Sequence, residues 1–335
     1  MTMRTAIAAS LCVLLLAGTV ALAELPAWTK DVAADAKWVI RVDVKALTGS
    51  AIGKHLLEQM TTEQRANLAK FTETFGFDPT ANLDSVVLYG AAYGPTAGVA
   101  VFHGQFDRDK LLKLLAANEG HEESKFGDRV IHRWTQKPEG PNDDGVRFGA
   151  FAAEGVIVIG RAKAPVEAAL NVLDGKAESL AGAKEAALSD LTPAPAGTFV
   201  QAAAKDFRLP EDAPPKAAFL RNMQAGHLLL GEAKDEAFAI LAVTATAAET
   251  AQKMRQMLTG FVALGQLALA QAEQDGKPAP AWAPLVKGAV IGGEGEVVTA
   301  RLSLAVKDLI ALAEKAKAAK AAAAEAKAAA GETER

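Results

Sequence analysis

The sequence predicts an α+β protein: mainly antiparallel sheet or sheets built from repeated strand–strand–helix units in two pseudo-repeated halves, with helices packed on the sheet. Three observations lead to this prediction. Several short segments alternate apolar and polar side chains at period two, as half-buried strands do. Turn residues join such segments in pairs, and a segment with apolar residues at helical spacing follows each pair. Strands joined by tight turns pair antiparallel, whereas parallel strands need a longer crossover.

The strand–strand–helix unit occurs four times along the chain. A lone strand precedes each pair of units, at residues 38–44 in the first half and 198–204 in the second. The halves match in element order only, because their sequence identity is negligible. The second strand and the following helix of the four units are expected at residues 98–106 and 107–117, 155–160 and 165–173, 237–244 and 247–269, and 297–306 and 307–317.

The N-terminus, residues 1–23, has the three parts of a cleavable secretory signal. Arg4 supplies a positive charge, residues 6–20 form an uncharged apolar stretch, and Ala21-Leu22-Ala23 is the small-x-small pattern that signal peptidase accepts. The alternative is a retained membrane anchor, but about 15 apolar residues are fewer than the ~20 that span a bilayer. We therefore expect the mature chain to begin at Glu24.

The single cysteine, Cys12, lies inside this signal. A lipoprotein anchor would require a small residue before the cysteine, and Leu11 stands there instead. Without Cys12 the mature chain has no disulfide, thiolate nucleophile or cysteine metal site, so a hydrophobic core must stabilise it. Loss of Arg4 lowers the formal net charge from −4 to about −5, and nucleic-acid binding normally requires a basic surface instead.

The strand predictions rest on alternation. Trp38, Ile40 and Val42 fall on one face of the first strand, with Arg41 and Asp43 on the other. Residues 297–306 alternate in the same way, whereas residues 156–159 are apolar on both faces, which is typical of a central strand. The hairpin turns are expected at Gly94-Pro95, Glu154-Gly155, Lys234-Asp235 and Gly292-Gly293-Glu294-Gly295.

The helix predictions rest on caps and on a longer period. Thr61 and Gln64 have the spacing of a capping box, and Gly76 marks the end of that helix. Asp107 is expected to cap the next helix. The apolar positions that define the helix faces are Leu68, Phe71 and Phe75, then Leu111, Leu114 and Leu115, then Met254, Met257, Leu258, Phe261 and Val262.

Composition divides the mature chain into three parts. The first α+β half is expected at residues 24–191 and the second at 196–315, separated by the Pro-containing linker 192–195, and a second linker occupies residues 277–284. Residues 316–335 form a tail rich in Ala, Lys and Glu, with high helix propensity and no large apolar side chain to bury. This tail is expected to be helical or disordered, with a partner-contacting arm as the alternative.

The histidines do not have the spacing of known metal motifs. His121 lies with Glu119, Glu122 and Glu123 in a segment predicted to be a solvated acidic loop, because residues so close in sequence cannot surround an ion without help from elsewhere. His55 and Glu58 share a helix face, but no companion Glu-x-x-His exists. The remaining three, His103, His132 and His227, are expected in strands as neutral, hydrogen-bonded side chains.

Other motifs are equally weak. Pro141-Asn142-Asp143-Asp144-Gly145 resembles part of a calcium loop, but Gly140 occupies a position that requires an acid, so we predict a turn. The glycines at 292–295 lie between two strands and make no phosphate loop. Neither a Gly-x-Ser-x-Gly nor a Ser-x-x-Lys motif occurs. We predict no catalytic, cofactor-binding or metal-binding residue, no cofactor, and no transmembrane anchor after signal cleavage, since residues 257–270 are too few to span a bilayer.

Part of the first half resembles a known group of proteins. Its segments are Trp38-Val39-Ile40-Arg41-Val42-Asp43-Val44, Gly76-Phe77-Asp78-Pro79, Leu83-Asp84-Ser85-Val86 and Gly104-Gln105-Phe106-Asp107. They are similar to those of a loose group of uncharacterised exported bacterial α+β proteins. This resemblance covers about a quarter of the chain and implies an α+β fold and export. It implies no activity and no functional residue.

These observations favour an exported non-enzymatic protein that acts by binding or structural contact in the periplasm or cell envelope, with an unknown protein or apolar ligand as its partner. One alternative is a carrier of an apolar or lipid-like ligand, in which the helix bearing Met254, Met257, Phe261 and Leu264 covers a cavity on a curved sheet. In that segment plain core packing is the simpler explanation. The other alternative is a hydrolase with scattered catalytic residues.

Overall fold

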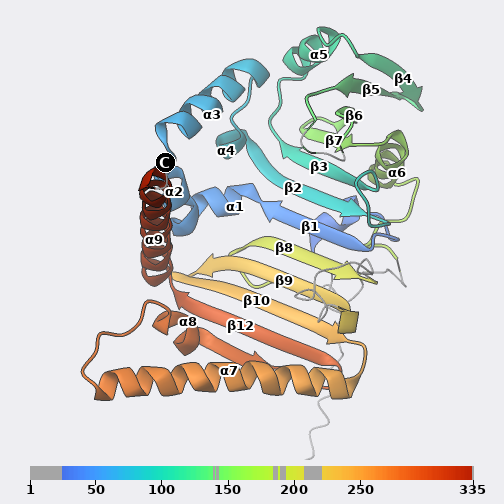
Figure 1. Cartoon of the computed structure of the whole chain (residues 1–335). Helices are drawn as coiled ribbons and strands as arrows, with labels where there is room; N and C mark the ends of the chain where they lie inside the picture. The colour runs from blue at the N-terminus through green and yellow to red at the C-terminus, as the bar shows by residue number, and fades with distance from the viewer. Residues whose placement is uncertain are drawn as a thin grey trace, which may run out of the picture.

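The protein is described by a computed structural model that covers residues 25–138, 140, 143–183, 188, 194–206 and 221–333. The predicted signal and part of the linker at 192–195 lie outside these residues. The described strands form one 12-stranded sheet in the order β11-β12-β10-β9-β8-β1-β2-β3-β7-β6-β5-β4, and every pair of neighbours is antiparallel (Figure 1). The predicted α+β class is therefore confirmed.

The strands are β1 (Trp38–Asp43), β2 (Leu83–Gly90), β3 (Gly98–Gly104), β4 (Glu122–Phe126), β5 (Arg129–Thr135), β6 (Val146–Ala153), β7 (Val156–Gly160), β8 (Thr198–Lys205), β9 (Met223–Ala233), β10 (Glu236–Ala245), β11 (Ala289–Gly292) and β12 (Val297–Ala305). The helices are η1 (Ala27–Asp31, a 3-10 helix), α1 (Val44–Gly49), α2 (Ala51–Glu58), α3 (Thr62–Phe75), α4 (Pro79–Asn82), α5 (Arg108–Ala116), α6 (Lys163–Leu173), α7 (Ala248–Gln274), α8 (Ala283–Gly288) and α9 (Val306–Thr333).

The sheet order shows the pseudo-repeat of the two halves. Outward from the centre, the first half runs β1-β2-β3-β7-β6 and the second runs β8-β9-β10-β12-β11. In each half a lone strand is followed by two hairpins, and a helix follows each hairpin. The β4–β5 hairpin, inserted after α5, has no counterpart in the second half and extends the sheet at its first-half end. Glu122 and Glu123 begin β4, so the prediction of a loop was wrong for these two residues.

The two halves meet where β1 pairs with β8, in the register Trp38↔Ala204 to Val42↔Val200. The hydroxyl of Tyr93, in the β2–β3 turn, donates to the carbonyl of Lys205 at 2.7 Å and so fastens the end of β8. At the other end of the same strands, the Glu232 carboxylate of β9 accepts from the backbone N–H groups of Ala51 and Ile52, both at 2.9 Å. A second-half side chain therefore caps α2 of the first half.

One face of the first half carries the main core. Val39, Val87, Val101 and Val158 come from four adjacent strands and are completely buried. Helix α6 contacts β3, β6, β7 and η1, and places Val166 and Leu170, both without exposed surface, against this face. At about 25 cal/mol for each Å² of apolar surface removed from water, such side chains supply most of the stabilisation.

The helix termini follow the predicted caps. Thr61 and Gln64 form both hydrogen bonds of the capping box, Gly76 ends α3 with a φ of 78°, and Asp107 accepts from the backbone N–H of Lys110 at 2.9 Å. The tail predicted at 316–335 continues α9 as helix to Thr333. Helix α9 contacts α2, β10 and β12, and it runs past the strand ends toward α2 (Figure 1). None of the described helices combines the length and hydrophobicity needed to cross a bilayer.

The cap formed by Glu232 predicts a stability loss that crosses the two halves. We expect Glu232→Ala to cost about 1 kcal/mol, the usual effect of removing an N-terminal cap, which corresponds to a fall of about 2 °C in melting temperature. Thermal unfolding followed by circular dichroism measures this. Glu236→Ala, which removes an exposed carboxylate from the adjacent strand, is the control and should change the melting temperature less. Equal effects for the two variants would contradict the capping role.

Candidate functional site

The sheet face opposite the main core is open at its centre. Directly paired residues of neighbouring antiparallel strands lie on the same face, and the registers connect Leu241, Leu228, Ala202, Ile40 and Leu88 across β10, β9, β8, β1 and β2. Ile40 is 40% exposed and Leu241 is 43% exposed, although neither lies on an edge strand of the sheet. This apolar face therefore lacks the cover that η1 and α6 give to the other one.

A shallow cavity of about 340 Å³ lies on this open face and crosses the β1–β8 junction. Its volume is at the lower end of small-molecule sites, which range over about 300–1,000 Å³. Almost all of its lining is apolar, and it consists of Trp38, Val39, Ile40, Tyr93, Ala202, Ala203, Ala204, Gly226, His227, Leu228 and Leu241. Its β8 residues are all alanines, and its larger side chains come from β1, β9, β10 and the β2–β3 turn.

The polar side chains of the lining are engaged within the protein. The indole N–H of Trp38 donates to the carbonyl of Ala92 at 2.9 Å, and the Tyr93 hydroxyl donates to Lys205 as described above. His227 also has an interaction partner in the protein. Because these groups are engaged internally, the cavity is suited to an apolar group that makes no directional polar contact.

Two glycines make room for Trp38 on the open face. A Cβ atom at Gly90 would lie 2.8 Å from the indole Nε1, and one at Gly98 would lie 2.7 Å from Cζ2. The indole therefore lies directly over β2 and β3, where any larger residue would displace it. These glycines were not singled out in the sequence, and only the cross-strand register explains them.

Helix α7 covers only the second-half end of the open face, where Ala251 packs against Val298, and does not cover its centre as the carrier alternative required. It contacts β10, β11, β12 and α8, and it lies along the second-half end of the sheet (Figure 1). Of the side chains expected to line a cavity or fill a core, only Met254 packs against the buried residues Ala245, Ala251 and Val298. For the other three side chains, both the cavity lining and the core packing were wrong predictions. Met257 is 54% exposed, Phe261 62% and Leu264 64%. Such exposed apolar stripes are typical of interaction surfaces.

The strand placements predicted for three histidines, His103, His132 and His227, are confirmed in β3, β5 and β9. His103 lies 3.1 Å from a carboxylate oxygen of Asp31. The structure also joins two histidines that the sequence kept apart: His121 Nε2 lies 3.0 Å from His132 Nδ1, and the two rings are stacked.

His132 is 5% exposed. Burial holds the pKa of His132 below its ordinary value of 6.5, and the nearby His121 and Arg108 act in the same direction against the carboxylate of Glu123. We infer that the imidazole of His132 is neutral near pH 7.

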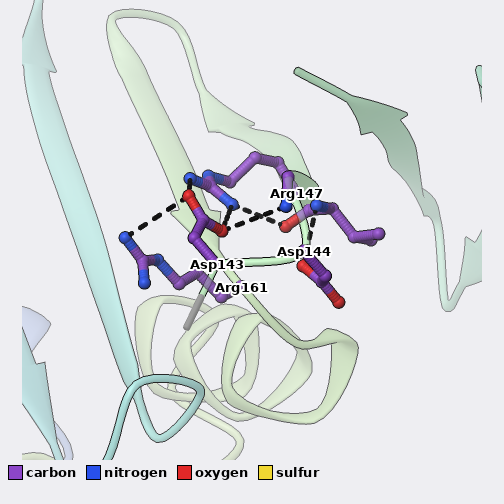
Figure 2. A network of polar contacts seen from close by, with 6 residues as sticks. Asp143, Asp144, Arg147 and Arg161 are labelled. Carbon is purple, nitrogen blue, oxygen red and sulfur yellow. Dashed lines mark hydrogen bonds and ion pairs between the residues drawn. The ribbon is translucent and has the colours of Figure 1, made fainter. Parts of the chain in front are cut away.

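Residues 143–145, the described part of the calcium-like segment, include the aspartate of an arginine network. The Arg147 guanidinium donates to both carboxylate oxygens of Asp143, at 2.8 and 2.7 Å, and Arg161 lies 3.8 Å from the same carboxylate (Figure 2). Asp144 accepts from the backbone N–H of Val146 at 2.9 Å. The Asp143 side chain is only 3% exposed, and its charge is balanced by arginine.

Comparisons with known proteins give no family. No family model matches the chain, and no curated protein is significantly similar to it. Solved structures of TP0453 are similar in part: crystal form III has 11% identity and a TM-score of 0.47 over 86% of this chain and 97% of that one. Crystal form I has 11% identity and a TM-score of 0.44 over 86% and 96%, and form IV has 12% and 0.43 over 85% and 95%.

The lowered pKa of His132 predicts a specific pH dependence of stability. The unfolded chain binds a proton to this imidazole at a higher pH than the folded chain does. The contribution of His132 to the free energy of unfolding is therefore complete above about pH 6.5 and is lost as the pH falls through the pKa of the folded state. We expect the melting temperature to fall between about pH 7 and pH 5, and less steeply in His132→Asn.

NMR titration of the histidine ring protons measures the His132 pKa directly. His55→Asn, a change on α2, is the control variant for the melting experiment and should leave the slope unchanged. A His132 titration midpoint at or above 6.5 would contradict the inference that burial dominates.

Proposed function

We propose that this chain is an exported, non-enzymatic bacterial protein of the periplasm or cell envelope that binds an apolar, lipid-like ligand on the open face of its sheet. The observation that carries the proposal is the cavity across β1, β8, β9 and β10, whose polar side chains are engaged internally. Export rests on the signal-like residues 1–23, and N-terminal sequencing of periplasmic material should give Glu24 first.

The number of methylenes that must be buried indicates the kind of ligand. Each fully buried methylene contributes about 0.8 kcal/mol, so roughly ten are needed to reach the ~8 kcal/mol of a micromolar complex. Burial on an open face is partial, and binding also costs entropy. A long hydrocarbon chain fits these requirements better than a small polar metabolite, which would need free hydrogen-bonding groups to hold it.

Binding of the fluorescent apolar probe N-phenyl-1-naphthylamine, and its displacement by lauryl alcohol, test the proposal. Leu241→Asp places a carboxylate on the open face at a half-exposed position, where the change is compatible with folding. We expect the affinity for the probe to fall at least about tenfold, because burying an unpaired carboxylate is strongly unfavourable.

Phe261→Asp is the matched control, since it places the same charge on an exposed apolar residue of α7. It should leave the affinity within about twofold, as a surface change away from the site does. Loss of probe binding in Phe261→Asp with none in Leu241→Asp would move the binding site to α7. No saturable binding by the folded wild-type protein would overturn the proposal.

A further inference from the structure

Three potential metal ligands share one face at the first-half end of the sheet. Glu123 lies in β4 and His121 directly precedes this strand, two residues away, the spacing at which side chains of an extended chain point the same way. Glu123 is paired directly with His132 of the neighbouring strand β5, which brings the second histidine to the same face. The further ligand that residues 119–123 could not supply by themselves is therefore His132 of β5.

The ligand atoms form a compact triangle. His121 Nε2 lies 3.0 Å from His132 Nδ1, and the same carboxylate oxygen, Glu123 Oε1, lies 3.9 Å from the first nitrogen and 3.6 Å from the second. The point equidistant from these three atoms lies about 2 Å from each, which matches the 2.0–2.2 Å of zinc bonds to histidine nitrogen and carboxylate oxygen.

A hydrogen-bonded histidine pair does not explain the position of Glu123. Its oxygen is too far from either nitrogen for a hydrogen bond, for which about 3.2 Å is the usual limit. Its distances to the two nitrogens are nevertheless close to the separation of about 3.3 Å expected between neighbouring ligand atoms around a tetrahedral zinc ion. The carboxylate is thus placed to share an ion with the imidazoles.

The surroundings favour a cation held at the rim. The side chains of His121 and His132 are 14% and 6% exposed, so both rings are fixed by packing, whereas Glu123 is 59% exposed and borders solvent. Two imidazoles and one carboxylate are a known zinc ligand set, and they leave a fourth position for water.

We propose that His121, Glu123 and His132 form a binding site for a divalent transition-metal ion, with zinc as the ion it takes. This site is separate from the proposed apolar site and does not depend on it: the metal ligands come from β4, the residue before it and β5, whereas the cavity is lined mainly by β1, β8, β9 and β10.

Isothermal titration of the purified exported protein, without a histidine tag and after chelator treatment, with ZnCl₂ tests the proposal. We expect one zinc ion per chain. Zinc should raise the melting temperature by a few degrees, because an ion that binds only the folded state stabilises it, and EDTA should reverse the shift. Cobalt(II) in place of zinc should give the visible absorption of a site with nitrogen and oxygen ligands.

Glu123→Gln removes the exposed ligand and should weaken zinc binding at least about tenfold, the lower range found even for residues that only support a ligand. Glu122→Gln is the matched control: the neighbouring carboxylate points to the other face, where it lies 3.3 Å from Arg133, and its loss should leave the affinity unchanged. His121→Asn should abolish the one-to-one binding.

The control variants decide between a site and general attraction of cations. Absence of saturable zinc binding by the folded protein would overturn the proposal. Equal zinc affinity in Glu123→Gln and Glu122→Gln, with His121→Asn also unchanged, would overturn it as well, because the ion would then be held elsewhere on the acidic surface.

Discussion

The pairing of β1 with β8 is the interaction on which the rest of this structure depends. It joins two five-stranded arrangements, β1-β2-β3-β7-β6 and β8-β9-β10-β12-β11, into one sheet and removes two strand edges that would otherwise be open to other chains. Tyr93 and Glu232 fasten its two ends. The apolar cavity crosses this pairing, so neither half alone contains the proposed ligand site.

The open face results from unequal covering of the sheet. In the first half, η1 and α6 pack against the face that holds the main core. On the other face, Ala202 of β8 and the two glycines beneath Trp38 add little or no side-chain volume between larger residues. Helix α7 packs at the second-half end of the sheet and leaves the centre uncovered. The same face continues to β4 and β5, where its lining changes from aliphatic side chains to the His121, Glu123 and His132 cluster.

Local signals predicted the elements, and non-local contacts decided the sites. Alternation located β1 and β12, and the Thr61 and Asp107 caps located two helices, because these patterns depend on near neighbours. The short polar strand β4 has no such alternation and was missed. Helix α7 is apolar on two sides, and periodicity cannot tell which side finds a partner, so the exposure of Phe261 was not foreseen. The cluster of His121 with His132 requires the β4–β5 register, which single-residue spacing does not give.

The proposed function requires an apolar chain to bind on the open face across the β1–β8 junction. Intermolecular NOEs between the methylenes of bound lauryl alcohol and the methyl groups of a selectively labelled sample test it most directly. We expect contacts to Ile40, Leu228 and Leu241, which line the cavity. Contacts confined to Met257 and Leu264 of α7, or none at saturating alcohol, would contradict it.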